Sequence, residues 1–146
     1  MRELTDFDEM YQELIIDHYK NPRNKSKLSK FTDEVKSHNP FCGDEIELQL
    51  NIKNEVIESI SISGRGCAIS QSSGSLLGET IIGKTIYEAR KDNESMRSLL
   101  KDEDLNDEQL DSLSDSSAIE GVRKFPVRIK CALLSWSALT DILSKY

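Results

Sequence analysis

The clearest hydrophobic pattern in the chain lies between residues 44 and 63. Isoleucine and leucine alternate with polar residues from Ile46 to Ile52, and a second alternating run follows from Val56 to Ile62. A period of two is typical of strands that bury one face. The segment 44–63 therefore predicts a β-hairpin with one apolar side.

The register of this hairpin can be predicted from its apolar residues, because directly opposed residues share a face of the sheet. The pairs that oppose apolar side chains are Ile52 with Val56, Leu48 with Ile60, and Ile46 with Ile62. This pairing centres the turn on Asn54. Asparagine tolerates the left-handed backbone conformation that a tight loop needs.

The same register has a consequence for the open end of the hairpin. Continued outward, it sets Asp44 opposite Gly64 and Cys42 opposite Gly66, one residue before Cys67. Two cysteines that are distant in the sequence are therefore expected to meet. Asp44 follows Cys42 by two positions on an extended chain, so both side chains can point the same way.

Helical patterns surround the hairpin. Residues 6–19 have amphipathic spacing, and residues 84–100 suggest another helix. Residues 68–82 predict a helix with a surface of small side chains, which can pack close to the sheet. The acidic stretch 101–117 predicts short helical pieces and loop, and a long final helix is expected from Pro126 to Lys145. Together with the hairpin, these segments predict an α+β fold.

The final helix has an apolar stripe and one cysteine outside it. The stripe consists of Ile129, Leu133, Trp136, Leu139 and Leu143. At about 100° per residue, Cys131 lies away from this stripe, so it need not be a simple core residue.

Length and composition narrow the class of protein. The 146 residues suit a single domain over 1–146, and a net charge of −7 without a basic stripe argues against nucleic acid as a partner. No apolar run approaches the ~20 residues that a membrane span needs. The start of the chain is too acidic and polar for a secretory signal, which predicts a cytoplasmic protein.

The chain has three cysteines. An odd number in a reducing compartment argues against a disulfide framework. Buried free cysteine is common, and no local pattern supports a special role for Cys131. If Cys131 faces the open end of the hairpin, however, three thiols and the Asp44 carboxylate complete a tetrahedral zinc site.

Four motifs in the chain closely resemble the U-type iron–sulfur cluster assembly family. They are Asp-His-Tyr-Lys-Asn-Pro-Arg-Asn at 17–24, Cys-Gly-Asp at 42–44, Gly-Arg-Gly-Cys-Ala-Ile-Ser at 64–70 and Phe-Pro-Val-Arg-Ile-Lys-Cys at 125–131. The family's fold is a small antiparallel sheet with helices packed on one face, which agrees with the predicted elements. We expect a short edge strand beside the hairpin.

The resemblance implies the site residues. Cys42, Asp44, Cys67 and Cys131 match the family's metal-binding positions. Arg128, one turn before Cys131, is a candidate for gating the metal or contacting a partner.

Within the family, the chain is similar to the SufU branch. Scaffold members carry histidine immediately before the third cysteine, whereas this chain has Lys130, whose protonated amine is a poor ligand. The segment between Lys84 and Phe125 is also long, as in SufU proteins. The resemblance thus implies a zinc-dependent sulfur acceptor that takes persulfide sulfur on Cys42 from a SufS-type cysteine desulfurase. It would act with that enzyme rather than as an independent catalyst.

Two alternatives remain open. The same residues could assemble a [2Fe–2S] cluster on a scaffold and pass it to apo-proteins. The chain could also be a zinc-stabilised binding module without sulfur chemistry. For a sulfur acceptor, the expected recipients are a downstream Suf scaffold or apo-proteins.

Overall fold

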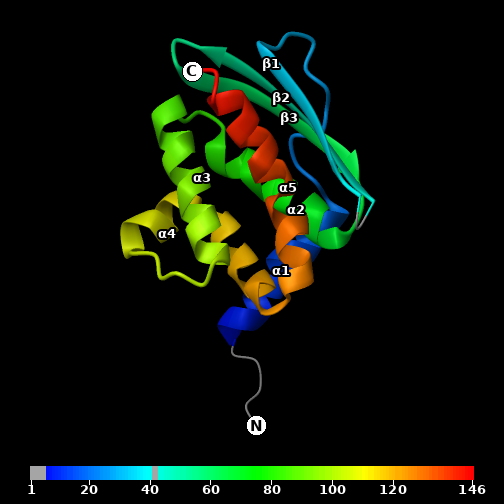
Figure 1. Cartoon of the computed structure of the whole chain (residues 1–146), viewed down its shortest axis with the longest axis vertical. Helices are drawn as coiled ribbons and strands as arrows, with labels where there is room; N and C mark the ends of the chain where they lie inside the picture. Colours follow the sequence, from blue (N-terminus) through cyan, green and yellow to red (C-terminus); the bar gives the residue numbers. More distant parts are fainter. Residues whose placement is uncertain (1–5, 41–42) are drawn as a thin grey trace.

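The computed structural model describes residues 6–40 and 43–146, with side chains described from residue 11 onward. The elements in chain order are α1 (Asp6–Lys20), β1 (Asp33–Asn39), β2 (Asp44–Lys53), β3 (Val56–Arg65), α2 (Ala68–Ile81), α3 (Ile86–Leu100), α4 (Asp107–Leu113), the 3₁₀ helix η1 (Ser114–Lys124) and α5 (Pro126–Leu143). The helices gather on one side of a three-stranded antiparallel sheet, which confirms the predicted α+β fold (Figure 1).

The sheet has the strand order β1-β2-β3. The predicted hairpin forms β2 and β3, and the expected edge strand is β1. This strand has one apolar residue, Val35, so it lacks the alternation that marks its neighbours. Only its place beside β2 identifies it as a strand.

The predicted hairpin register was wrong by one residue next to the turn and by two residues beyond a bulge. Lys53 pairs with Val56, which leaves a two-residue turn of Asn54 and Glu55. Both turn residues are left-handed, with φ of 53° and 62°, as a type I′ turn requires. The left-handed conformation predicted for Asn54 is therefore confirmed, but Glu55 shares it.

A bulge in β3 accounts for the rest of the register. Ile52 pairs with Ile57 and Asn51 with Ser59, so Glu58 has no partner in β2. The extra residue turns Ile57 into the core, where it is fully buried.

Beyond the bulge, the apolar pairs differ from the predicted ones. Leu50 opposes Ile60 and Leu48 opposes Ile62. Gly64 faces Ile46, not Asp44 as predicted.

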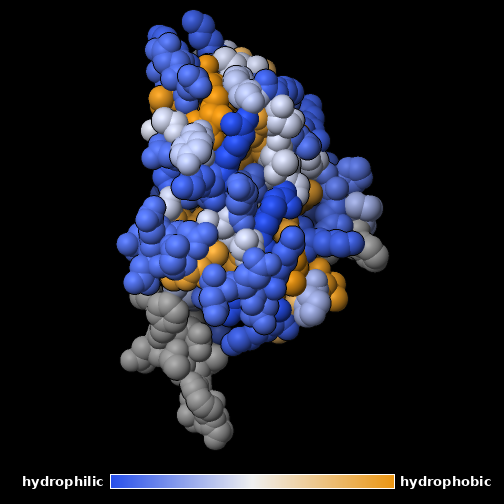
Figure 2. All heavy atoms as spheres, turned by 60° about the vertical axis from the view of Figure 1, so that its left-hand side comes forward, coloured by the Kyte–Doolittle hydropathy of each residue, from blue (hydrophilic) through white to orange (hydrophobic). Residues whose placement is uncertain are grey.

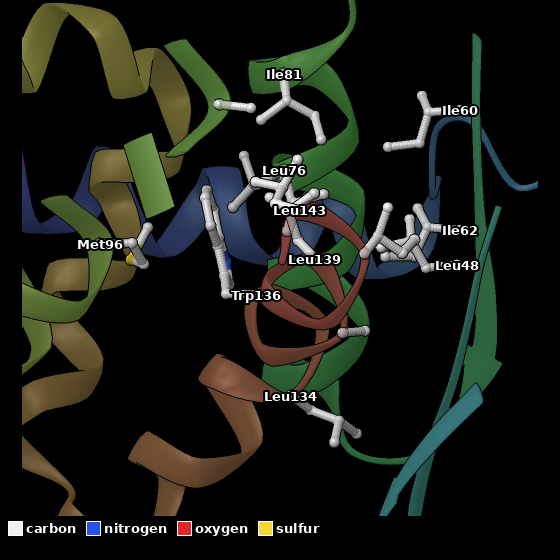
Figure 3. Packing of buried hydrophobic residues seen from close by; sticks show 14 of the residues in the cluster. Leu48, Ile60, Ile62, Leu76, Ile81, Met96, Leu134, Trp136, Leu139 and Leu143 are labelled. Carbon is white, nitrogen blue, oxygen red and sulfur yellow. The ribbon is translucent and has the colours of Figure 1, made fainter. Parts of the chain in front are cut away.

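The core lies between the sheet and the helices. Leu48, Ile60 and Ile62 point from the sheet toward Leu76 of α2 and Leu139 of α5 (Figure 3). The small residues of α2 let this helix approach the sheet closely, as predicted for residues 68–82. Hydrophobic burial of this kind contributes roughly 25 cal/mol per Å² of apolar surface.

The buried face of α5 is wider than the predicted stripe. Its buried residues are Cys131, Ala132, Leu134, Ser135, Trp136, Ala138, Leu139, Ile142 and Leu143, whereas Ile129 and Leu133 of the predicted stripe are only partly buried. The reason is that α5 packs against the sheet, α2 and α3 at once. Trp136 fills the side of α5 toward Met96 of α3 (Figure 3).

The acidic stretch 101–117 forms α4 and the start of η1, in agreement with the prediction of short helical pieces. Figure 2 shows a mostly hydrophilic face on the side that carries α3 and α4, with small apolar patches between polar side chains. Among the described helices, none is both long and apolar enough to cross a membrane.

Candidate metal centre

Asp44, Cys67 and Cys131 come together from three different elements. Asp44 is the first residue of β2, Cys67 is the N-cap of α2, and Cys131 lies in α5. One ligand atom from each lies within 4.8 Å of the others. Ligand atoms around a tetrahedral zinc ion lie roughly 3.3–3.8 Å apart, so only small side-chain adjustments separate this arrangement from coordination.

The Asp44 carboxylate is held by the chain that follows β3. Asp44 is fully buried, and its Oδ1 accepts a hydrogen bond from the Cys67 amide at 2.8 Å. Its Oδ2 lies 3.8 Å from the Cys67 sulfur. Because the carboxylate sits beside the N-terminus of α2, the helix dipole also favours its negative charge.

Gly66 makes this contact possible. Its φ is +141°, and a Cβ there would stand 2.8 Å from the Asp44 Cα and even closer to Oδ1. Any side chain at this position would displace the carboxylate. The glycine is therefore required by the approach of Asp44 to Cys67.

The Cys131 thiol is fully buried on the inner face of α5. Asn39, at the end of β1, places its Nδ2 3.8 Å from the Cys131 sulfur. Asn39 is also the cross-strand partner of Asp44. The packing of α5 on β1 thus carries Cys131 to the end of the sheet where Asp44 lies.

The chemistry of these donors suits a thiophilic metal. Cys67 and Cys131 are both free thiols, Cys67 being partly exposed and Cys131 buried. Two sulfur ligands and one carboxylate are a ligand set that zinc accepts, and soft thiolates also bind iron in clusters. The described part of the chain therefore brings together three groups that could hold a metal ion.

Cys42, the predicted fourth ligand, lies outside the described residues. It follows that its place at the site stays a prediction. The next residue, Gly43, is described: its φ is +68° and its amide donates to the Asn39 oxygen at 2.9 Å.

Arg128 is exposed on the first turn of α5. It lines a groove of about 750 Å³ together with Ile15 and Ile16 of α1 and Phe125. Ile69, two residues after Cys67, lines the same groove, so the groove runs close to the metal site. A role for Arg128 in gating or partner contact stays a prediction.

The motif at 17–24 has an architectural role in this structure. His18 is buried, and its Nδ1 lies 2.7 Å from the Ser75 hydroxyl of α2. The Arg23 amide donates to the same hydroxyl at 2.9 Å, and the Arg23 side chain pairs with Asp17 at 2.6 Å. Burial, together with the nearby Arg23 charge, lowers the pKa of His18 below its ordinary value.

Asn39 is the residue of the site that sequence reasoning missed. The sequence offered one signal, a polar residue just before Pro40 and close to Cys42. This signal was not enough, because the contact of Asn39 with Cys131 of α5 joins residues far apart in the chain.

A family model described as the NifU-like N terminal domain matches residues 10–145. This chain belongs to that family. The match agrees with the resemblance to the U-type iron–sulfur cluster assembly family seen in the four motifs.

Individual relatives extend the comparison. The chain is 39% identical to the zinc-dependent sulfurtransferase SufU of Bacillus subtilis (strain 168), over 97% of this chain and 94% of that protein. It is 32% identical to the iron–sulfur cluster assembly scaffold protein IscU of Streptococcus pyogenes serotype M1, over 97% and 87% of the two chains.

A crystal structure of a SUF-system protein has the same fold. It is a candidate iron–sulfur cluster assembly scaffold protein from Fervidobacterium islandicum AW-1, with a TM-score of 0.84, 30% identity and coverage of 92% of this chain and 97% of that one. The predicted family and its SufU-like character are therefore confirmed.

Proposed function

We propose that this protein is a zinc-dependent sulfurtransferase of iron–sulfur cluster assembly, which accepts sulfur on Cys42 from a cysteine desulfurase of the SufS type. The observation that carries the proposal is the convergence of Asp44, Cys67 and Cys131 within 4.8 Å. The similarity to the SufU protein of Bacillus subtilis supports it.

The residues that would hold zinc are these three together with Cys42. When bound, zinc supplies a charge that keeps its cysteine ligands as thiolates near neutral pH. Lys130 stands immediately before Cys131, where scaffold members of the family carry histidine, and lysine is a poor metal ligand near neutral pH. This favours a site closed by Asp44 over the histidine-containing site of a cluster scaffold.

The sulfur step uses the Cys42 thiolate as the nucleophile. The thiolate attacks the outer sulfur of the desulfurase persulfide, so that a new sulfur–sulfur bond forms on Cys42. The sulfur–sulfur bond of the desulfurase breaks, and its cysteine leaves as a thiolate. No external oxidant or reductant is needed, because one persulfide replaces another.

The partners follow from this chemistry. The desulfurase supplies the sulfur, and a downstream Suf scaffold or apo-protein receives it. We propose that Arg128, exposed beside the groove near Cys67, contacts the desulfurase.

Free thiols at the site fit a cytoplasmic location, where the glutathione pool keeps cysteines reduced.

Two measurements test the proposal. Protein purified without added metal should contain one zinc per chain and no iron or sulfide. Intact-mass spectrometry after incubation with the desulfurase and cysteine should show ~32 Da added to the wild type and nothing added to Cys42→Ala, as transfer of one sulfur atom requires. Iron with acid-labile sulfide in place of zinc would instead identify a cluster scaffold.

A further inference from the structure

Asn39 contacts three of the segments that meet at the site at the end of the sheet. It pairs across the sheet with Asp44, and its backbone oxygen accepts the amide of Gly43 at 2.9 Å. Its side-chain nitrogen lies 3.8 Å from the sulfur of Cys131. A single buried residue therefore links β2, the turn before β2, and α5.

The chemistry of the sulfur sets the direction of this contact. A metal-bound thiolate has no proton, so it can only accept a hydrogen bond, and the Asn39 amide supplies an N–H. A zinc ion with three thiolates and one carboxylate carries net negative charge, which is costly in a buried place unless donors offset it. Hydrogen-bond donors that contact a metal ligand without binding the metal themselves orient that ligand and tune its reactivity.

We infer that Asn39 is a positioning residue that keeps Cys131 as a resident metal ligand, so that sulfur is accepted at another thiol of the site. The inference rests on the proposed function. The hydrogen bond withdraws electron density from the Cys131 sulfur and lowers its nucleophilicity. It also holds the sulfur toward Asp44 and Cys67.

The primary test compares Asn39→Leu with a matched control. Leucine has nearly the shape of asparagine but no donor. The control is Asn93→Leu, because Asn93 is also buried and donates to Trp136 and Thr140 at 3.1 and 2.9 Å, away from the site. In competition with a chelator, Asn39→Leu should bind zinc about 10–100-fold more weakly than wild type, and Asn93→Leu should match wild type.

The absorption spectrum of the cobalt(II)-substituted protein reports on the sulfur ligands themselves, and a general loss of stability would not shift its bands. Loss of the donated hydrogen bond raises the energy of the sulfur lone pairs. The sulfur-to-cobalt charge-transfer band of Asn39→Leu should therefore shift to lower energy, while that of Asn93→Leu stays in place. If Asn39→Leu does not unfold cooperatively, Asn39→Ser replaces it, because its short hydroxyl side chain does not reach the sulfur.

Sulfur mapping completes the test. In Asn39→Leu, part of the added persulfide should move to Cys131, whereas in wild type it should stay off this residue. Unchanged zinc affinity and an unchanged cobalt spectrum in the Asn39 variant overturn the inference. A wild type that binds no zinc and gains sulfur on no cysteine would instead refute the proposed function. The two failures are distinct, because the inference fails on a comparison of the Asn39 variant with wild type, whereas the proposed function fails on the wild type alone.

Discussion

The metal site has two halves that are built in different ways. In the half formed by Asp44 and Cys67, a backbone amide holds the carboxylate at 2.8 Å and a glycine makes room for it. In the half formed by Cys131 and Asn39, a helix and an edge strand meet only because the core packs them together. The first half is therefore largely organised by the hairpin, whereas the second depends on the whole fold.

Removal of zinc should have the largest effect and should separate the two halves. Structural zinc contributes on the order of 10 kcal/mol of folding free energy, so chelation or Cys131→Ala should lower the melting temperature markedly. Amide exchange should rise most in the first turns of α5, because the Asp44–Cys67 contact survives without metal. An unchanged melting curve after verified zinc removal would show that the metal does not stabilise the fold.

Gly66→Ala should break the hairpin half directly. The new Cβ would press on Asp44 in a left-handed conformation, which costs on the order of 1–3 kcal/mol and displaces the carboxylate. The free energy of unfolding, measured with urea, and the zinc content should both fall. Gly121→Ala is the matched control, since a Cβ at Gly121 meets nothing within 4 Å, and equal losses in the two variants would contradict the assigned role of Gly66.

Ser73→Ala tests how the two halves are coupled through the core. The Ser73 hydroxyl donates to the Ala132 oxygen at 2.6 Å and accepts from the Trp136 indole at 3.0 Å, so it joins α2 to the segment just after Cys131. Its removal leaves the buried Trp136 indole N–H without this acceptor, at a cost of about 1–3 kcal/mol before relaxation, whereas the Ala132 oxygen keeps its hydrogen bond within α5. The free energy of unfolding, measured with urea, should fall by this amount, and the fluorescence of Trp136 should change.

The exposed Ser144 offers a comparison for this variant. Its hydroxyl donates a hydrogen bond to the nearby Asp141 backbone oxygen at 2.8 Å. Ser144→Ala should leave both stability and fluorescence close to wild type. If Ser73→Ala behaves in the same way, the buried hydroxyl does not couple the helices.

The smallest expected effect concerns pH and the contact between α1 and α2. The pKa of His18 is lowered in the folded protein, chiefly by burial, from an ordinary value of 6.5. The unfolded chain therefore binds the proton more readily, so this contribution to stability is complete above the ordinary pKa and is lost as the pH falls through the folded value. Urea midpoints of wild type should decline with acidification more steeply than those of His18→Gln, and parallel curves would contradict this.

Much of the fold followed from local pattern. The alternation of apolar and polar residues located both strands of the hairpin, and the small residues of 68–82 predicted the close approach of α2. The register was wrong because apolar pairing over 46–62 left no place for a bulge. The type I′ turn at Asn54 and Glu55 shortens the loop to two residues, and the unpaired Glu58 restores the apolar match.

The site divides in the same way. From the sequence by itself came the hairpin, the cysteines and aspartate that a metal needs, and the motifs that mark the family, because these depend on residue types at short range. Only the tertiary structure turned Cys131 toward Asp44 and set Asn39 against its sulfur. The wide buried face of α5 arises from three neighbours at once, and no periodicity within one helix encodes how distant segments share its surface.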